Sequence, residues 1–198
     1  MNGAIVFSGR YGSTAQYSQW ISEATGLPVF DLAEASPDLT RYDFLVLGSS
    51  VVFFRATIRK WLKAHWPDLE GRHLILFTVS GAADGPKLRK WIAKSFPKEV
   101  LAGMQYVALR GRLKHEDVSW WLRILLKIGA LMNPDREAAA DEMHGFDYMD
   151  RDSIEPIVSM VERLQSESGV VRAGRGSSIR PYGSAQLHPP RQSTQFTR

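Results

Sequence analysis

The sequence predicts a three-layer α/β sandwich, in which helices cover both faces of a five-stranded parallel sheet. Short, uninterrupted apolar runs alternate along the chain with segments of helical periodicity. Such runs are typical of strands buried on both faces, and parallel neighbours must be joined by a crossover helix. In addition, loops rich in glycine and serine follow three of these runs. At 198 residues, 44% of them hydrophobic, the chain fits one doubly wound domain with strand order 2-1-3-4-5.

The first part of the chain predicts three strands and two helices. A helix is expected over 13–25, because apolar residues recur there at helical spacing and Gly26 and Pro28 end the pattern. A second helix is expected after the third strand, where one face carries Ile58, Trp61, Leu62 and His65. The strands are expected at 4–7 (AIVF), 28–32 (PVFDL) and 44–50 (FLVLGSS).

The remaining elements follow the same alternation. A fourth strand is expected at 73–80 (HLILFTVS), followed by a glycine loop and a helix over 88–95. A last strand is expected at 104–109 (MQYVAL), and a closing helix at 153–165. In such sheets ligands bind beyond the carboxyl ends of the strands, where the winding reverses. Three loops leave these ends, at 8–14, 49–56 and 80–86.

The first of these loops, FSGRYGSTAQ, has the composition of a phosphate-binding turn. Free backbone N–H groups and the helix dipole attract an anion at a helix start. Gly12 would let the backbone curl around a phosphate, Ser13 and Thr14 would offer hydroxyls, and Arg10 would add charge. The alternative is an ordinary turn in which Ser13 or Thr14 caps the helix. The loop matches neither GxxxxGK[ST] nor GxGxxG.

Residues 4–164 resemble the flavodoxin-domain family, and most closely the branch that contains the bacterial menaquinone-dependent protoporphyrinogen oxidases. In that branch the phosphate loop often has the sequence Ser-Lys-Tyr-Gly-Ser-Thr. GRYGST at 9–14 is similar to it at every position except the first. There Gly9 lacks the hydroxyl, and Ser8 offers one a residue earlier. GSSVVFF at 48–54 resembles the branch's loop after the third strand. GFDYMD at 145–150 resembles its segment before the last helix.

The resemblance implies a flavodoxin-like fold and FMN as cofactor. It assigns the phosphate to Ser8, Arg10, Tyr11, Gly12, Ser13 and Thr14. The isoalloxazine ring needs flat apolar walls and backbone groups near its edge. The expected wall is Ser50, Val51, Val52, Phe53 and Phe54, and the expected edge is Ser80, Gly81 and Ala82. The alternative for the two phenylalanines is that they plug the end of the sheet.

An apolar helix is expected at about 116–132, inserted into the domain formed by residues 1–168. It carries Trp121 and several leucines, and at 118–132 it is too short to span a bilayer. We expect it to contact a membrane surface, a quinone or a redox partner, with nearby arginines facing lipid phosphates or substrate carboxylates. The alternative is a core helix that packs on the domain or on a second subunit of a homo-oligomer. The resemblance places a long insertion here in the oxidase branch, which favours an enzyme.

The charge of the chain is unevenly distributed. The 25 Lys and Arg residues exceed the 21 Asp and Glu residues, but residues 169–198 hold five arginines and no acid. We expect this tail to be disordered and solvated, with a nucleic-acid arm or a membrane tether as alternatives. The rest is nearly neutral, unlike the acidic soluble flavodoxins, with basic clusters at 55–63, 87–98 and 110–115.

Other chemistries find no support in the sequence. There is no cysteine, the five histidines show no metal-ligand spacing, and Ser80 lacks the flanking glycine of a nucleophile elbow. A strand that begins at Ala4 leaves no room for a signal peptide, so we expect a cytoplasmic protein, or a peripheral one at the inner face of the membrane.

The residues and the resemblance together predict an FMN-dependent oxidoreductase. A small-molecule substrate, anionic and porphyrinogen-like, would pass a hydride to flavin N5, and a quinone would accept the electrons. No side chain is predicted to be catalytic, no metal is expected and no nucleic acid is expected as a partner. The alternatives are a non-catalytic electron-transfer flavodoxin and a flavin-free binding module.

Overall fold

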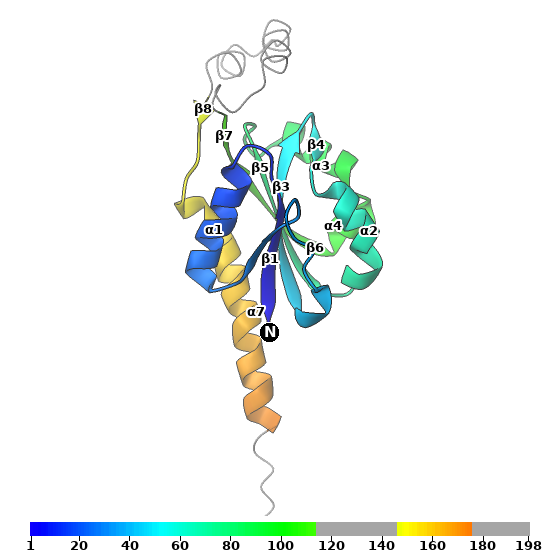
Figure 1. Cartoon of the computed structure of the whole chain (residues 1–198), viewed down its shortest axis with the longest axis vertical. Helices are drawn as coiled ribbons and strands as arrows, with labels where there is room; N and C mark the ends of the chain where they lie inside the picture. Colours follow the sequence, from blue (N-terminus) through cyan, green and yellow to red (C-terminus); the bar gives the residue numbers. More distant parts are fainter. Residues whose placement is uncertain (114–145, 176–198) are drawn as a thin grey trace, which may run out of the picture.

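A computed structural model describes residues 1–113 and 146–175 of the chain (Figure 1). The central sheet confirms the predicted architecture. Five parallel strands run in the order β2-β1-β3-β5-β6, which is 2-1-3-4-5 when only the parallel strands are numbered. They are β1 (Gly3–Ser8), β2 (Val29–Asp31), β3 (Phe44–Val52), β5 (His73–Ser80) and β6 (Met104–Arg110).

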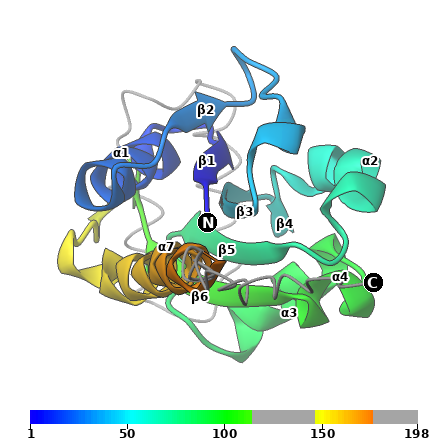
Figure 2. The same ribbon diagram turned by 90° about the horizontal axis from the view of Figure 1, so that it is seen from below.

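Helices cover both faces of the sheet, as Figure 2 shows from below. Successive strand residues face opposite sides, so alternate positions of β1 serve different cores. Ile5 packs under α1 (Ser13–Thr25) and α7 (Glu155–Arg175), in a core that includes Ile21 and Ile157. The helices on the other face are α2 (Arg59–Leu69), α3 (Pro86–Ser95) and α4 (Lys98–Ala102).

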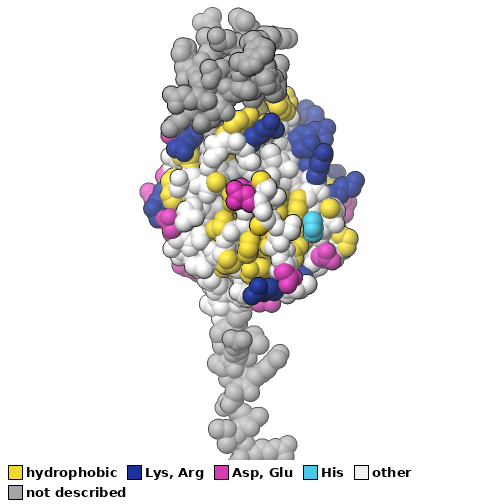
Figure 3. Space-filling view, in the orientation of Figure 1, with side chains coloured by type: hydrophobic (Ala, Val, Ile, Leu, Met, Phe, Trp, Pro, Cys, Tyr) yellow, Lys and Arg dark blue, Asp and Glu magenta, His cyan; other side chains and the backbone are white. Residues whose placement is uncertain are grey.

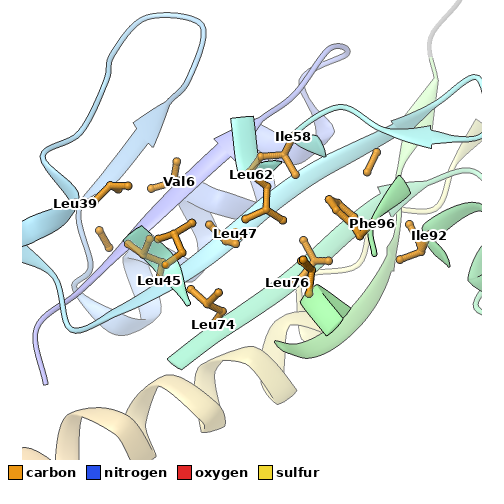
Figure 4. Packing of buried hydrophobic residues seen from close by; sticks show 14 of the residues in the cluster. Val6, Leu39, Leu45, Leu47, Ile58, Leu62, Leu74, Leu76, Ile92 and Phe96 are labelled. Carbon is orange, nitrogen blue, oxygen red and sulfur yellow. The ribbon is translucent and has the colours of Figure 1, made fainter. Parts of the chain in front are cut away.

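The core on the α2 and α3 side explains why the strands are uninterrupted apolar runs. Leu45 and Leu47 of β3 and Leu62 of α2 lie close together in this core, and Leu76 of β5 leads on to Phe96 and Ile92 at its other side (Figure 4). Burying a side chain of this size contributes about 1.5–3 kcal/mol, which favours apolar residues along strands covered on both faces, whereas the buried Ser49, Ser50, Thr78 and Ser80 lie toward the carboxyl ends of β3 and β5.

Three short strands and one helix of the structure were not expected from the sequence. The loop expected at 49–56 is wrong: β3 continues to Val52 and pairs antiparallel with β4 (Arg55–Ala56), which adds a sixth strand to the sheet. The helix α4 was not expected. Two short strands, β7 (Arg112–Leu113) and β8 (Phe146–Asp147), form a separate antiparallel pair.

Two 3-10 turns complete the described chain, η1 (Leu39–Arg41) and η3 (Asp152–Ile154). The closing helix α7 starts two residues later than expected and runs to Arg175, into the segment for which a disordered tail was expected. The remainder of that tail and the helix expected at 116–132 lie outside the described residues, so both stay predictions. No helix of the described part of the chain is long and apolar enough to cross a membrane.

Candidate functional site

The three predicted loops meet at the carboxyl edge of the sheet, at the top of Figure 1. The strand register brings their first residues together: Ser8 of β1 is paired with Ser49 of β3, and Ser50 is paired with Val79 of β5. Strand β1 runs on to α1 on one face, whereas β3 and β5 run on to α2 and α3 on the other. This is the position at which ligands bind in doubly wound sheets.

Helix α1 begins at this edge without a side-chain cap. Gly12 is its N-cap residue at φ 79°, and among the described residues there is no side-chain cap hydrogen bond at this end of the helix. The first backbone bond of the helix runs from Gln16 N–H to the Gly12 carbonyl at 2.9 Å. The N–H groups of Ser13, Thr14 and Ala15 therefore precede the hydrogen-bonded ladder and form the positive end of the helix. The alternative that Ser13 or Thr14 caps α1 is wrong, because both lie inside the helix.

The hydroxyls of Ser13 and Thr14 are both engaged by protein groups. Ser13 Oγ accepts a hydrogen bond from Arg112 N–H at 3.1 Å and lies 3.3 Å from the Arg112 carbonyl. Thr14 Oγ1 lies 2.8 Å from Ser50 Oγ, and both side chains are buried. Their predicted role in phosphate binding stays a prediction, and it requires these hydroxyls to exchange partners. The exposed backbone at Gly9 and Gly12 and the exposed side chain of Arg10 need no such exchange.

The first loop is fastened to the second through Thr57. Thr57 Oγ1 donates a hydrogen bond to the Ser8 carbonyl at 2.5 Å, and it lies 3.2 Å from Ser49 Oγ. Gly9 leaves little space beneath it, since a Cβ there would lie 3.2 Å from Thr14 Cβ. Tyr11 is half-buried. The loop is thus held at its base, while its tip is open.

The second loop is a two-residue hairpin with unusual residues at its tip. Val51 pairs with Ala56 and Val52 with Arg55, which leaves Phe53 and Phe54 as the turn. Both have positive φ, 49° and 62°, as a type I′ turn requires, although that turn normally uses Asn-Gly. A side chain in this region costs about 1–2 kcal/mol.

The two phenylalanines do not plug the end of the sheet, because they are 52% and 61% exposed. Phe54 leans on α3, with its ring centroid 4.9 Å from that of Trp91. Their predicted role as a wall for a flavin ring is untested, but the exposure leaves both aromatic surfaces accessible to a ligand or a partner.

The third loop, at 80–86, packs closely against the segment that begins at Phe146. Ser80 Oγ donates to the Ala82 carbonyl at 2.9 Å. A Cβ on Gly81 would lie 2.4 Å from Phe146 Cζ, so only glycine fits beside that ring. Farther along, Asp84 pairs with Arg89 at 3.1 Å, and the hydrogen bond from Arg89 lowers the pKa of the Asp84 carboxyl.

Arg110 at the end of β6 supports this third loop, a role that the sequence analysis missed. Its Nη2 donates to the Gly81 carbonyl at 3.1 Å, and its guanidinium lies 3.4 Å from the centre of the Tyr148 ring. Its Nε is buried and has no hydrogen-bond partner among the described residues. The sequence marked Arg110 only as part of a basic cluster, because its contacts join segments far apart along the chain.

Tyr17 of α1 ties the same region to the C-terminal segment. Its hydroxyl donates to the Arg110 carbonyl at 2.8 Å and accepts from Asp150 N–H at 3.1 Å. The described part of the GFDYMD segment, residues 146–150, therefore packs against the carboxyl edge. No group of three or more potential metal-ligating side chains occurs in residues 1–113 and 146–175.

Two surface depressions lie away from this edge. One lies along α7, beside Ser159 and Arg163, and another lies near the opposite end of β5 and β6, beside His73 and Met104. Neither contains a residue of the three loops.

Comparison with known proteins identifies the family. Residues 4–138 match the flavodoxin domain. No curated protein matches the chain. Solved structures with similarity include a flavodoxin from the domain Archaea, with 14% identity, TM-score 0.43, and coverage of 72% of this chain and 94% of that one.

Two further structures are similar at the same level. The Trp repressor binding protein from Bacillus subtilis has 15% identity and TM-score 0.43, over 72% of this chain and 95% of that one. A flavoprotein in complex with FMN from Lactobacillus acidophilus NCFM has 12% identity and TM-score 0.42, over 55% and 91%. Such low similarity says nothing of function, but the family match spans more than half of the chain. The chain therefore belongs to the flavodoxin domain family.

Proposed function

We propose that this protein binds FMN at the carboxyl edge of its sheet and acts as an oxidoreductase. The observation that carries the proposal is the start of α1 beside the β3 and β5 loops, where Gly12 at φ 79° is exposed and leaves the first turn without a side-chain cap, although Ser13 and Thr14 themselves are buried. Free amides at the positive end of a helix, at the point where the winding of the sheet reverses, form an anion site. Membership of the flavodoxin domain family makes FMN the expected anion.

The residues present fit FMN in distinct ways. The amides of residues 12–15 would hold the phosphate, and the exposed Arg10 would add charge. The hairpin at Phe53 and Phe54 would supply an apolar wall. The Ser80–Ala82 backbone would approach the ring edge, while the Phe146 ring occupies the space where a side chain of residue 81 would lie. Bound FMN would supply the hydride acceptor.

An anionic substrate fits the charge of this edge. Arg10 and Arg55 are both exposed, on the first loop and beside the second loop respectively. Cations around a site raise the local concentration of an anionic substrate. We therefore extend the proposal to a porphyrinogen-like substrate and a quinone acceptor. The contact of residues 118–132 with a membrane or quinone lies outside the described residues and stays part of this proposal.

One observation favours a flavin-free binding module as the second candidate. The hydroxyls of Ser13 and Thr14, which the family's phosphate loop presents to FMN, are bonded to Arg112 and Ser50. If these bonds persist with ligand, phosphate binding rests on backbone and Arg10 alone. Affinity for FMN separates the two candidates.

The test is an FMN titration followed by flavin fluorescence or calorimetry. We expect saturable binding that weakens about tenfold in Arg10→Gln, the loss typical of one charge-assisted hydrogen bond. Arg41→Gln is the matched control, since Arg41 is also exposed but lies in η1, away from the three loops. Absence of binding at millimolar FMN contradicts the proposal. Oxidation of a porphyrinogen with a quinone, compared with electron exchange alone, then separates an enzyme from a carrier.

A further inference from the structure

We propose that the hairpin tip and one face of α3 form a docking surface for an anionic lipid bilayer. The docking surface consists of Phe53, Phe54 and Arg55 of the hairpin with Lys87, Lys90, Trp91 and Lys94 of α3. The proposal goes beyond flavin binding, although it shares Phe53 and Phe54 with the proposed flavin wall, so the α3 lysines are what distinguish the docking surface. It concerns described residues rather than the segment 118–132.

The hairpin tip is strained without being buried. Two bulky residues occupy a turn that requires positive φ at both positions, where Asn and Gly would fit without strain. Neither gains much from burial, since more than half of each side chain is exposed. Strain that packing does not offset points to a contact outside the chain. Two adjacent exposed phenylalanines at a protruding tip make that contact apolar.

The face of α3 next to the hairpin is basic. Lys87, Lys90 and Lys94 follow the spacing i, i+3, i+7, which places them on one face, and all three are exposed. Trp91 lies on the same face and joins it to the hairpin. Its ring centroid is 4.9 Å from that of Phe54, and Lys87 Nζ is 5.6 Å from the ring.

No acidic residue interrupts this region. Residues 53–67 and 85–98 contain none, although they include nine lysines and arginines. The nearest acid before α3, Asp84, is paired with Arg89. In Figure 3 the Lys and Arg side chains gather at the upper right, where Figure 1 places β4 and α3.

This combination fits a bilayer surface better than a protein partner. An apolar tip enters the boundary between headgroups and acyl chains, and lysines around it reach lipid phosphates while their stems cover the apolar surface. The exposed lysines lie along a stripe of α3 beside the hairpin rather than converging on one point, as a flat anionic surface requires. Bound in this way, the carboxyl edge of the sheet faces the membrane.

The experiment is sedimentation of the full chain with vesicles of phosphatidylcholine alone or of phosphatidylcholine with phosphatidylglycerol. We expect binding to the anionic vesicles only, weakened by added salt because the attraction is screened. K87Q/K94Q should weaken it at least about tenfold, because two charges leave the surface. R41Q/R163Q, which removes the same charge from exposed sites elsewhere, should change it less than about twofold. Phe54→Ser should also weaken it.

Three results would overturn the proposal. They are no binding to anionic vesicles, equal loss in the two double variants, and equal binding to neutral vesicles. Polyglutamate serves as the probe for an acidic protein partner. Suppose that polyglutamate binds the chain whereas vesicles do not, and that this binding is lost in K87Q/K94Q but unchanged in Phe54→Ser. The surface then serves an acidic protein instead of a membrane.

Flavin binding is scored separately on the same proteins. Because Lys87 and Lys94 lie outside the three loops, K87Q/K94Q should bind FMN as the unaltered chain does. Loss of vesicle binding with normal FMN affinity isolates the docking surface. Failure of the unaltered chain to bind FMN, with vesicle binding intact, counts against the proposed function alone. Circular dichroism confirms that each variant is folded.

Discussion

Arg110 stacks on Tyr148, with its guanidinium carbon 3.4 Å from the centre of the ring. The two residues are separated by the segment 114–145, so the contact closes the base of the insertion. Through its bond to the Gly81 carbonyl, Arg110 also links this base to the third loop. One side chain thus joins the end of β6, the loop after β5 and the segment after β8.

Replacing Arg110 should cost stability. Arg110→Met removes a desolvated cation–π contact and a hydrogen bond, and we expect a loss of about 2–3 kcal/mol in the free energy of unfolding. Arg110→Lys keeps the charge but not the planar stack, so it should recover only part of this. Urea unfolding measures both. If the two variants lose equally little, the stack does not support the loop.

Relieving the hairpin turn should stabilise the protein. Asn tolerates positive φ far better than Phe, so Phe53→Asn should raise the free energy of unfolding by about 1 kcal/mol. Phe53→Val, with a β-branched side chain, should lower it. Thermal and urea unfolding measure both changes. A destabilised Phe53→Asn variant would show that the Phe53 ring makes contacts that outweigh the strain.

Gly81 should not accept a side chain while Phe146 stays in place. A Cβ on Gly81 would lie only 2.4 Å from Phe146 Cζ, so the ring would have to move, and Gly81→Ala should cost about 1–3 kcal/mol. In a Phe146→Ala background the same change should cost much less. A double-mutant cycle by urea unfolding measures the coupling, expected at about 1 kcal/mol or more. Additive effects would mean that the ring is free to turn away.

Tyr106 should make stability fall at alkaline pH. Burial raises the pKa of its hydroxyl above the ordinary 10.0, although the hydrogen bond with Thr78 opposes this. A raised pKa means that the folded chain holds the proton more tightly. This contribution is complete below the ordinary pKa and disappears as pH rises through the folded value.

Tyr106→Phe removes that titration. Its free energy of unfolding should fall less steeply above about pH 10 than that of the unaltered chain, even though the change itself costs stability by leaving Thr78 without its partner. Urea unfolding across this range compares the slopes. Parallel slopes would assign the alkaline loss to other groups.

Much of the fold could be predicted because its signals are local. The helix α1 and the strand β5 were predicted with the bounds that the structure has, since apolar spacing and glycine or proline stops mark them. The alternation of strands and helices predicted a parallel sheet, and the count of five strands favoured the order 2-1-3-4-5, which the structure has. The hairpin at Phe53 and Phe54 was missed because two phenylalanines carry no turn signal.

For the candidate site, the sequence predicts where the loops lie in the fold but not which groups their side chains contact. The three segments lie at the edge of the sheet where the sequence places them, because the end of each buried strand is visible as the end of an apolar run, although the second is a hairpin rather than a loop over 49–56. The partners of their side chains were not visible. Ser13 bonds to Arg112 and Thr14 to Ser50, across 99 and 36 residues of chain. Such contacts depend on the fold as a whole rather than on local pattern.

The central claim is that free amides at the start of α1 hold the phosphate of FMN. The most direct measurement compares the affinities of the purified protein for FMN and for riboflavin, which has the same ring but no phosphate. The account predicts that FMN binds at least about a hundredfold more tightly, since charge-assisted hydrogen bonds to several amides are lost with the phosphate. Equal affinities for the two flavins, or binding of neither, would contradict it.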